Sequence, residues 1–398
     1  MKKFLLLIIM FSCLTFIIYI NYKGKDKDEM VIKSEENIKE EVRGVFISYI
    51  DYSYLLKGKS VAEQKNNIDK MISNIKDNDF NMIILQVRPF SDAIYNSQIY
   101  LSSRTVVENE NDKLELDILD YFIKRSHEQD IKIHAWLNPY RIRSVESKDD
   151  IATENYYYKW FDTNNIEINK DGIYLNPASQ EVLDYIISGV EELVLNYDID
   201  GLLYDDYFYP SETIDLKNYE EYVKAGGTFT IEEYRKMNIN TLIYETNSAI
   251  KKINKKVLFG ISPAGNISNN LKDEYLDVEH ILKGKDFIDY IMPQIYYGFE
   301  NEAMPFISTI ELWNSLITND IDLYVALGLY KSGLEDAYAG SGKNEWLNNN
   351  DIIKKQIVIS RLNSNYKGFV IFRYNHLFND LETNQTLIQE VNNMKSIF

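Results

Sequence analysis

The chain contains few of the residues on which disulfide, metal and nucleic-acid chemistry depend. Its 398 residues include one cysteine, Cys13, which excludes an internal disulfide and a zinc site built from several thiolates. The four histidines (His127, His134, His280 and His376) do not have the spacing of a histidine metal motif, so we expect no metal and no cofactor. A net charge of -18 leaves no basic surface for nucleic acid.

Long apolar runs are also rare, and the one that stands out lies near the start of the chain. Phe4 to Ile20 is uncharged, follows a basic pair and is close to the ~17 residues that a spanning helix needs at minimum. It predicts a membrane anchor or signal segment over residues 1–22, and therefore an exported protein that is anchored to the membrane or secreted. An uncleaved anchor is preferred, followed by a removed signal peptide and then by a lipid-modified Cys13. Residues 23–41 form a charged spacer.

Tyrosine, in contrast, is abundant. The chain has 31 tyrosines, within a composition of 45% hydrophobic and 26% charged residues that is typical of a folded globular protein. A tyrosine ring offers a flat apolar face and a hydroxyl, which suits contact with sugar rings. The same side chain also serves as a general core aromatic, so both interpretations remain open for each tyrosine.

A short strand-like run followed by a longer amphipathic segment repeats along residues 42–398. The runs are residues 42–50, 81–90, 131–140, 199–207, 257–263, 288–297, 323–330 and 368–375. Helix-like segments lie between them, at about 60–78, 115–129, 179–197, 231–254, 304–319, 349–363 and 379–396, with a short one near 273–283. This alternation predicts an α/β fold, a (β/α)8 TIM barrel, which we expect to be monomeric. A doubly wound sheet would need a glycine-rich turn after its first strand, and "ISYIDYSY" has no glycine.

The carboxyl ends of the strands should form the active site of such a barrel. The fourth run ends in Asp205 and Asp206, and we expect Asp205 to share a face with Leu203 and to point into the cleft. Neighbours on a strand face opposite ways, so Asp205 and Asp206 should not readily form a pair of catalytic carboxylates. Asp206, where the strand gives way to the loop, is expected to tilt in, cap a turn or pair with an arginine. Asp92, after the second run, is therefore the preferred partner, and Asp51, after the first, is the second choice.

Amide, guanidinium and aromatic side chains follow the other runs. Such a set suits a neutral, polyhydroxylated ligand, because it combines aromatic walls with hydrogen-bond donors and acceptors. The predicted substrate-binding residues are Gln86, Arg88, Asn138, Tyr207, Tyr209, Gln294, Tyr296, Tyr297 and Arg373.

Several motifs occur in an order that resembles a known family. They are "GVFISY", "LQVRPFSDAIYNS", "HAWLNPYR", "YLNPASQEVLDYI", "DGLLYDDYFYP", "GISPAGN" and "DYIMPQIYYGF". Together they resemble the glycosyl hydrolase-like 10 family over roughly residues 41–375. The resemblance implies an exported bacterial glycosidase-like barrel that acts on peptidoglycan glycan strands stripped of their peptides. By position it highlights Arg88, Asp92, Asn138, Asp205, Asp206, Tyr207, Gln294 and Tyr296.

The chain also departs from this family. The family often has His where this chain has Leu203, and Trp where it has Tyr297. The absence of the His removes a possible proton partner beside Asp205.

A looser resemblance to chitinase-type barrels is carried by Asp200, Gly201 and Asp205, but the remaining acidic positions of that motif are not acidic here. If the substrate carries N-acetyl groups, its own amide could act as the nucleophile.

Two functional hypotheses follow from these observations. The first is a glycoside hydrolase with Asp205 as the principal carboxylate and Asp206 or Asp92 as the proton donor. The second is a non-catalytic carbohydrate-binding barrel of the cell envelope, which the missing second carboxylate and Leu203 favour. The expected partners are a polysaccharide and, through the N-terminal segment, a membrane.

Overall fold

The computed structural model describes most of the chain downstream of the N-terminal segment, namely residues 41–145, 148–284, 286–380 and 384–398. The predicted anchor over 1–22 and nearly all of the spacer over 23–41 lie outside these residues. No helix within the described ranges is long and apolar enough to cross a bilayer. Residues Val42–Phe398 form one compact unit.

Eight parallel strands close into a barrel, as the alternation of strand-like and helix-like segments predicts. Around the ring their order is β1-β13-β12-β11-β10-β9-β5-β2. Each predicted run overlaps one barrel strand, and all eight strands end earlier than the run. The strands are β1 (Val42–Ile47), β2 (Met82–Arg88), β5 (Lys132–Leu137), β9 (Gly201–Tyr204), β10 (Leu258–Ile261), β11 (Tyr290–Ile291), β12 (Asp322–Gly328) and β13 (Tyr366–Phe372).

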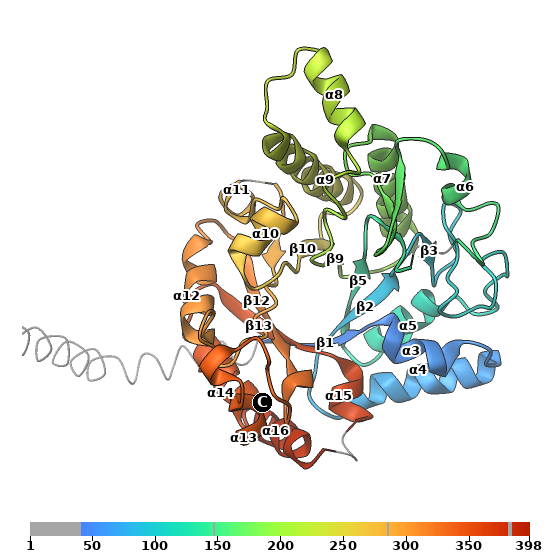
Figure 1. Cartoon of the computed structure of the whole chain (residues 1–398). Helices are drawn as coiled ribbons and strands as arrows, with labels where there is room; N and C mark the ends of the chain where they lie inside the picture. The colour runs from blue at the N-terminus through green and yellow to red at the C-terminus, as the bar shows by residue number, and fades with distance from the viewer. Residues whose placement is uncertain (1–40, 146–147, 285, 381–383) are drawn as a thin grey trace, which may run out of the picture. The chain divides into compact units, whose positions relative to one another are not determined.

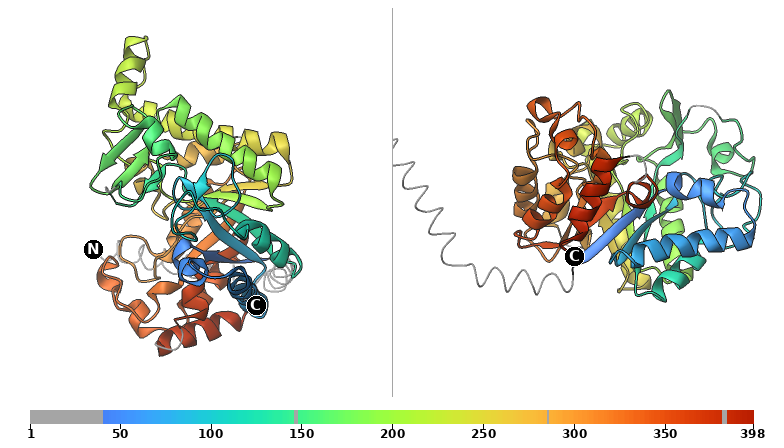
Figure 2. Two further views of the ribbon diagram at one scale, coloured as in Figure 1. Left: turned by 90° about the vertical axis from the view of Figure 1, so that its right-hand side faces the viewer. Right: turned by 90° about the horizontal axis from the view of Figure 1, so that it is seen from below.

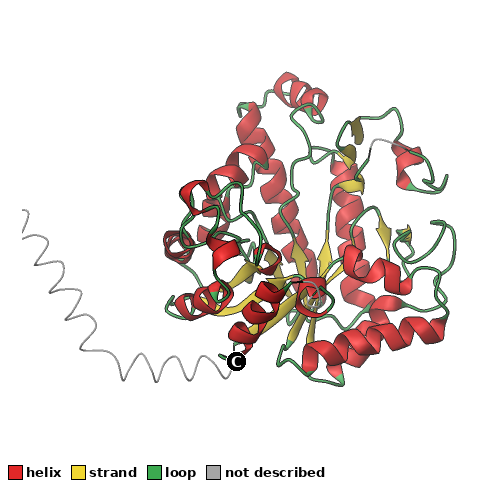
Figure 3. Ribbon diagram, turned by 60° about the horizontal axis from the view of Figure 1, so that its bottom comes forward, coloured by secondary structure: helices red, strands yellow, loops and turns green. Residues whose placement is uncertain are grey.

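Helices surround the strands, as Figure 3 shows with the helices in red around the yellow barrel. The predicted helical segments correspond to α4 (Val61–Lys76), α5 (Ile118–His127), α7 (Gln180–Asn196), α9 (Ile231–Ile253), α11 (Val278–Lys283), α12 (Phe306–Leu316), α14 (Ile352–Ser360) and α16 (Gln385–Lys395). The pattern did not indicate α3 (Tyr49–Leu56), α6 (Tyr156–Trp160), α8 (Leu216–Lys224), α10 (Ile267–Asp273), α13 (Glu345–Asn348), α15 (Tyr374–Phe378) and the 3-10 turns η1 (Leu329–Lys331) and η2 (Gly340–Gly342).

Two of the outer helices illustrate why these segments are helical. Ser60 caps α4, since its side chain accepts a hydrogen bond from the amide of Glu63, and Ser179 caps α7 in the same way. On α7 the apolar residues Val182, Ile186, Val190 and Leu193 all lie buried, at helical spacing. The cap fixes where each helix begins, and the apolar stripe fixes which face packs on the barrel.

Additional structure follows several strands at their carboxyl ends. The segment after β2 contains β3 (Asp92–Ala93), which pairs with β4 (Leu101–Ser102). A three-stranded sheet after β5 is formed by β6 (Arg141–Arg143), β8 (Gly172–Leu175) and β7 (Ile166–Asn169). After β9, helix α8 projects away from the barrel, and Figures 1 and 2 show it standing clear of the other helices.

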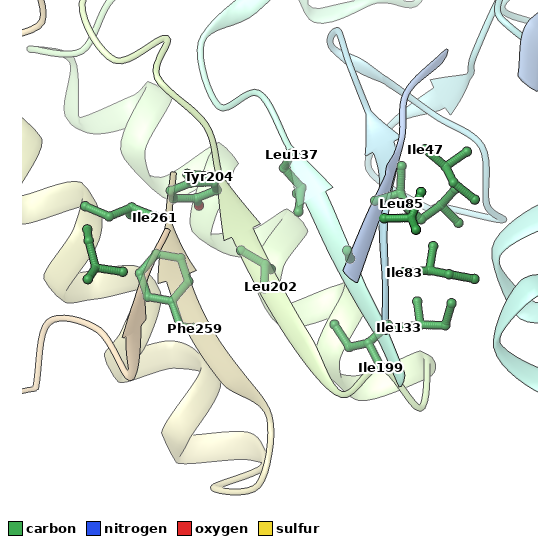
Figure 4. Packing of buried hydrophobic residues seen from close by; sticks show 14 of the residues in the cluster. Ile47, Ile83, Leu85, Ile133, Leu137, Ile199, Leu202, Tyr204, Phe259 and Ile261 are labelled. Atoms are coloured by element: carbon green, nitrogen blue, oxygen red, sulfur yellow. The ribbon is translucent and has the colours of Figure 1, made fainter. Parts of the chain in front are cut away.

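The core has two layers because residues of a strand alternate between its two faces. One buried cluster fills the barrel interior and includes Phe46, Met82, Trp136 and Leu203. The larger cluster lies between the strands and the helices; Figure 4 shows some of its strand residues, such as Leu202 and Phe259. The two clusters therefore show which side each strand residue faces when it reaches the end of the barrel.

Candidate active site

A pocket of about 400 Å³ opens at the carboxyl ends of the barrel strands. This is the end at which barrel enzymes place their chemistry. A larger hollow of about 490 Å³ lies outside the barrel along α9. The pocket at the strand ends is the candidate active site, because it gathers residues from most of the strands around two carboxylates. Its lining residues are Phe46, Ser48, Tyr49, Ile50, Gln86, Trp136, Arg141, Asp205, Asp206, Tyr207, Ser262, Gln294, Tyr296, Tyr330 and Phe372.

Asp205 faces this pocket because of the alternation along β9. Leu203 belongs to the cluster inside the barrel, whereas Leu202 and Tyr204 belong to the outer cluster. Asp205 continues the face of Leu203 and lines the pocket. The prediction that Asp205 shares a face with Leu203 and points into the cleft is confirmed.

Two side chains of the neighbouring strand β5 and its exit hold the Asp205 carboxylate. Oδ2 of Asp205 accepts hydrogen bonds from Nε1 of Trp136 at 3.1 Å and from Nδ2 of Asn138 at 2.5 Å. Asn138 in turn accepts one from Nε2 of Gln86 at 2.7 Å. Asn138 is fully buried and is not part of the pocket lining. It was predicted to contact substrate, and the structure places it behind Asp205 as a support.

Asp206 lines the same pocket, so its side chain tilts into the cleft, which is one of the three arrangements expected for it. Strand β9 ends at Tyr204 and Asp206 lies in a bend two residues beyond it, so the alternation that places Asp205 no longer sets the direction of Asp206. Gln294, whose Nε2 donates to the carbonyl of Ser262 at 2.9 Å, lies close enough to lower the pKa of Asp206. The two adjacent carboxylates therefore meet in one pocket.

This pair of carboxylates holds its protons more tightly than exposed aspartates do. Burial and the negative charge of Asp206 raise the pKa of Asp205 from 3.8 to about 7. Arg141 and the two hydrogen bonds to Asp205 act in the opposite direction. Burial also raises the pKa of Asp206. Both shifts favour retention of a proton by the pair, an arrangement that puts an acid and a carboxylate side by side in the pocket.

Arg141 lines the pocket but is not among the predicted site residues. It lies just past the third predicted run, at the start of β6, and its Nε donates to the carbonyl of Pro89 at 3.0 Å. Its guanidinium lies 5.3 Å from the ring centroid of Tyr207 and 4.9 Å from that of Phe90. The motif "HAWLNPYR" contained it, so the signal was present in the sequence.

Aromatic rings form much of the pocket wall. Tyr207 is 55% exposed, and its backbone amide lies 3.4 Å from Oδ1 of Asp205. Tyr296 packs against Tyr330 and Phe372, with both ring centroids 5.8 Å away. Flat faces beside carboxylates and amides suit a sugar ring. Of the predicted substrate-binding residues, the pocket contains Gln86, Tyr207, Gln294 and Tyr296.

Asp92, the preferred proton donor, lies elsewhere. It is 1% exposed, belongs to β3, and its Oδ2 accepts a hydrogen bond from the amide of Arg104 at 3.2 Å. Burial raises its pKa to about 6, while the charge of Arg143 lowers it. It does not line the pocket. The prediction that Asp92 faces the cleft is therefore wrong, because the segment after β2 folds into its own small sheet.

Arg88 is also turned away from the pocket. The pairing of β2 with β5 shifts between Gln86 and Arg88, so that Arg88 lies opposite Leu137 of the outer cluster. This bulge reverses the alternation, and the fully buried guanidinium packs 4.7 Å from the ring centroid of Tyr100. The predicted contact of Arg88 with substrate is wrong for that reason.

Three further predicted binding residues lie outside the main pocket. Tyr209 is buried and donates to Asp215 at 2.6 Å, and Tyr297 packs against the outer core. Arg373 forms an ion pair with Asp51 at 2.5 Å. The Asp51 carboxylate also accepts a hydrogen bond from the backbone amide of Ser48, as part of the capping box of α3. The alternative proton donor, Asp51, is thus a structural residue, because the first run turns into a helix after β1.

Glu274, which no strand end predicted, lies next to the aspartate pair. It is the C-cap residue directly after α10, and its carboxylate accepts hydrogen bonds from the amides of Phe208 at 2.7 Å and Tyr209 at 2.8 Å. Burial raises its pKa to about 7, and the charges of both aspartates contribute. Reading only the residues directly after each strand missed it, since α10 separates it from β10. Within residues 41–145, 148–284, 286–380 and 384–398, no three His, Cys, Asp or Glu side chains are grouped to hold a metal ion.

Comparison with known proteins points to one family. The family model described as glycosyl hydrolase-like 10 matches residues 41–338. The chain is 31% identical to glycosyl hydrolase YngK of Bacillus subtilis (strain 168) over 300 residues, which are 69% of this chain and 58% of YngK. It is 29% identical to glycosyl hydrolase DigH of Escherichia coli (strain K12) over 355 residues, which are 82% of this chain and 79% of DigH.

Solved structures share the fold at low sequence identity. The PgaB (BpsB) glycoside hydrolase domain from Bordetella bronchiseptica has a TM-score of 0.54 and 12% identity, covering 88% of this chain and 98% of that domain. The endo-1,4-beta-mannanase from Rhizomucor miehei also has a TM-score of 0.54, at 13% identity, covering 90% of this chain and 94% of that enzyme. These likenesses establish the barrel architecture.

Proposed function

Because the chain belongs to the glycosyl hydrolase-like 10 family, we propose that it is a glycoside hydrolase that cleaves an amino-sugar polymer of the cell envelope. Glycan strands of peptidoglycan without their peptides are the proposed substrate. The observation that carries the proposal is the pair Asp205 and Asp206 in a pocket walled by aromatic rings and amides. Glycosidic bonds are cleaved by carboxyl groups in such surroundings.

The raised pKa values suit this chemistry. A general acid works best when its pKa is near the operating pH, and burial raises the pKa of Asp205 to about 7. In the proposed reaction, the protonated member of the pair gives its proton to the glycosidic oxygen as the bond to the anomeric carbon breaks. The ionised member stabilises the positive charge that develops on the sugar ring.

An acetamido group of the substrate can complete the reaction. Asp205 and Asp206 are the only Asp or Glu residues that line the pocket among the residues the structure describes. We infer that the carbonyl oxygen of the reacting sugar's acetamido group bonds to the anomeric carbon, an exception to the two-carboxylate rule. Water then attacks that carbon, losing a proton to the carboxylate that acted as acid, and the bond to the acetamido oxygen breaks.

Export agrees with this substrate. The uncharged run from Phe4 to Ile20 supports a membrane anchor, or a signal segment that is removed. Either would place the barrel outside the cytoplasm, where a cell-envelope polymer is available.

The test is hydrolysis of purified glycan strands from which the peptides have been removed. The protein should release new reducing ends, and the Asp205→Asn variant should release at least 100-fold fewer per unit time, since general acid catalysis contributes about 10²–10⁴-fold. Undiminished turnover by this variant would remove the central assignment. Binding of the strands without any new reducing ends would instead favour the non-catalytic carbohydrate-binding barrel.

A further inference from the structure

A second, smaller pocket adjoins the candidate active site. Its volume is about 120 Å³, and Arg141 and Tyr207 line both pockets. The guanidinium of Arg141, 5.3 Å from the Tyr207 ring centroid, thus forms part of the wall between them. The remaining lining residues belong to the small pocket alone: Tyr140, Tyr174, Tyr209, Pro210 and Glu274.

The size of this pocket limits what it can hold. Pockets for whole small-molecule ligands have volumes of about 300–1,000 Å³, and the active-site pocket of about 400 Å³ falls in that range. The small pocket, at about 120 Å³, is too small for a complete sugar ring. It fits a substituent carried by the sugar next to the one in the active site.

The chemistry of the lining selects among substituents. Tyrosine rings and Pro210 offer an apolar surface, Arg141 offers N–H donors, and Glu274 offers a carboxyl group. An acetamido group matches this set. Its methyl group is apolar, its carbonyl oxygen can accept a hydrogen bond from the guanidinium, and its N–H can donate a hydrogen bond to a carboxyl oxygen. The nearby charges of Asp205 and Asp206, which raise the pKa of Glu274, oppose a negatively charged substituent.

We propose that the small pocket is a subsite that binds the acetamido group of the sugar adjoining the cleavage site. The protein would then bind N-acetylated sugars at this position in preference to deacetylated ones. This inference rests on the proposed function for the identity of the polymer. Tyr174 is the residue with which to test it. It lies on β8, outside the active-site pocket, and it is only partly buried.

The experiment measures binding in the Asp205→Asn background, which separates binding from hydrolysis. The probes are peptide-free glycan strands and the same strands after chemical removal of their N-acetyl groups. Tyr174→Ala should weaken binding of the acetylated strands roughly 3- to 10-fold, the contribution expected of one aromatic wall, and should leave binding of the deacetylated strands unchanged. Tyr174→Phe, which keeps the ring, should bind as the background does. Tyr244→Ala, on the outer hollow along α9, is the control and should change neither affinity.

The outcomes distinguish the subsite from the hydrolase proposal. Equal loss of affinity for both strands, or no loss for either, would overturn the subsite even if the wild-type protein hydrolyses glycan. A loss confined to the acetylated strands, together with no hydrolysis by the wild-type protein, would support the subsite and reject the hydrolase. Failure of the background variant to bind either strand would overturn the subsite and the polymer on which it rests.

Discussion

The exits of strands β2 and β9 carry similar residues and have different structures. After β9, the alternation of the strand brings Asp205 into the pocket, and the turn beyond it adds Asp206. After β2, a shift in pairing turns Arg88 outward, and Asp92 becomes part of a small buried sheet. An acidic residue after a barrel strand is therefore a candidate for catalysis only if the local backbone keeps it on the inner face.

Asp51 and Asp205 also differ in the groups that surround their carboxylates. Asp51, at the exit of β1, has a guanidinium at 2.5 Å and two backbone amides within hydrogen-bond distance. The Asp205 carboxylate accepts hydrogen bonds from two neutral side chains and lies beside the carboxylate of Asp206. In the second arrangement, burial and the neighbouring charge of Asp206 raise the pKa of Asp205 to about 7. The second arrangement is the one that an acid catalyst needs.

The largest expected effect distinguishes Asp206 from Asp92. Asp206→Asn should lower kcat on peptide-free glycan strands by at least about 100-fold, because the pair loses one of its two carboxyl groups. Asp92→Asn should leave kcat within about threefold, since Asp92 lies outside the pocket. Release of reducing ends measures both. If the two variants lose activity equally, the contrast between the two strand exits is lost.

The next effect concerns stability at the exit of β1. Asp51→Ala should lower the free energy of unfolding by about 3 kcal/mol, because it leaves the mostly buried Arg373 guanidinium without its partner and removes the capping box of α3. Urea denaturation followed by circular dichroism measures this. Arg125→Ala, which breaks the more exposed pair with Asp69, is the control and should cost less than about 1 kcal/mol. Equal losses would show that burial does not decide the strength of these pairs.

Asp92 should make stability depend on pH. Its pKa in the folded protein is raised to about 6, above the ordinary value of 3.8, so the folded state binds more protons between these values. Its contribution to stability is present below about pH 4 and is lost as the pH rises through about 6. Asp92→Asn should remove this pH-dependent loss of stability, and it should raise the free energy of unfolding at pH 7 by up to about 3 kcal/mol. Urea denaturation at pH 4 and pH 7 measures it. A variant whose stability falls as steeply as the wild type's would contradict the buried position of Asp92.

The smallest expected effect is that of Asn138. Asn138→Ala should lower kcat about tenfold, since it removes one charge-stabilising hydrogen bond. That hydrogen bond lowers the pKa of Asp205, so its loss should move the pH dependence of kcat to higher pH. Asn247→Ala, a buried asparagine on α9, is the control and should leave the pH profile in place. A drop in kcat at all pH values without a shift would mean that Asn138 only maintains the fold.

Much of the fold and part of the site could be predicted because they follow from local patterns. Alternation along β9 predicted the orientation of Asp205, and the helical periodicity at about 60–78 and 179–197 predicted α4 and α7, which Ser60 and Ser179 cap. Gln294 and Tyr296 could be placed because they continue the inner face on which Tyr290 and Met292 lie. These features depend on a few neighbouring residues and on the rule that barrel sites lie at the carboxyl ends of strands.

The sequence by itself determined the eightfold alternation, the apolar faces of strands and helices, and the aspartate that reaches the end of β9. Only the tertiary structure decided that Arg88 turns outward, that Asp92 and Asp51 are buried among structural partners, and that Arg141 and Glu274 lie beside the aspartate pair. The physical reason is that periodicity is set by backbone geometry within one element. Bulges, turns and long-range ion pairs depend on contacts between segments that are distant in the chain.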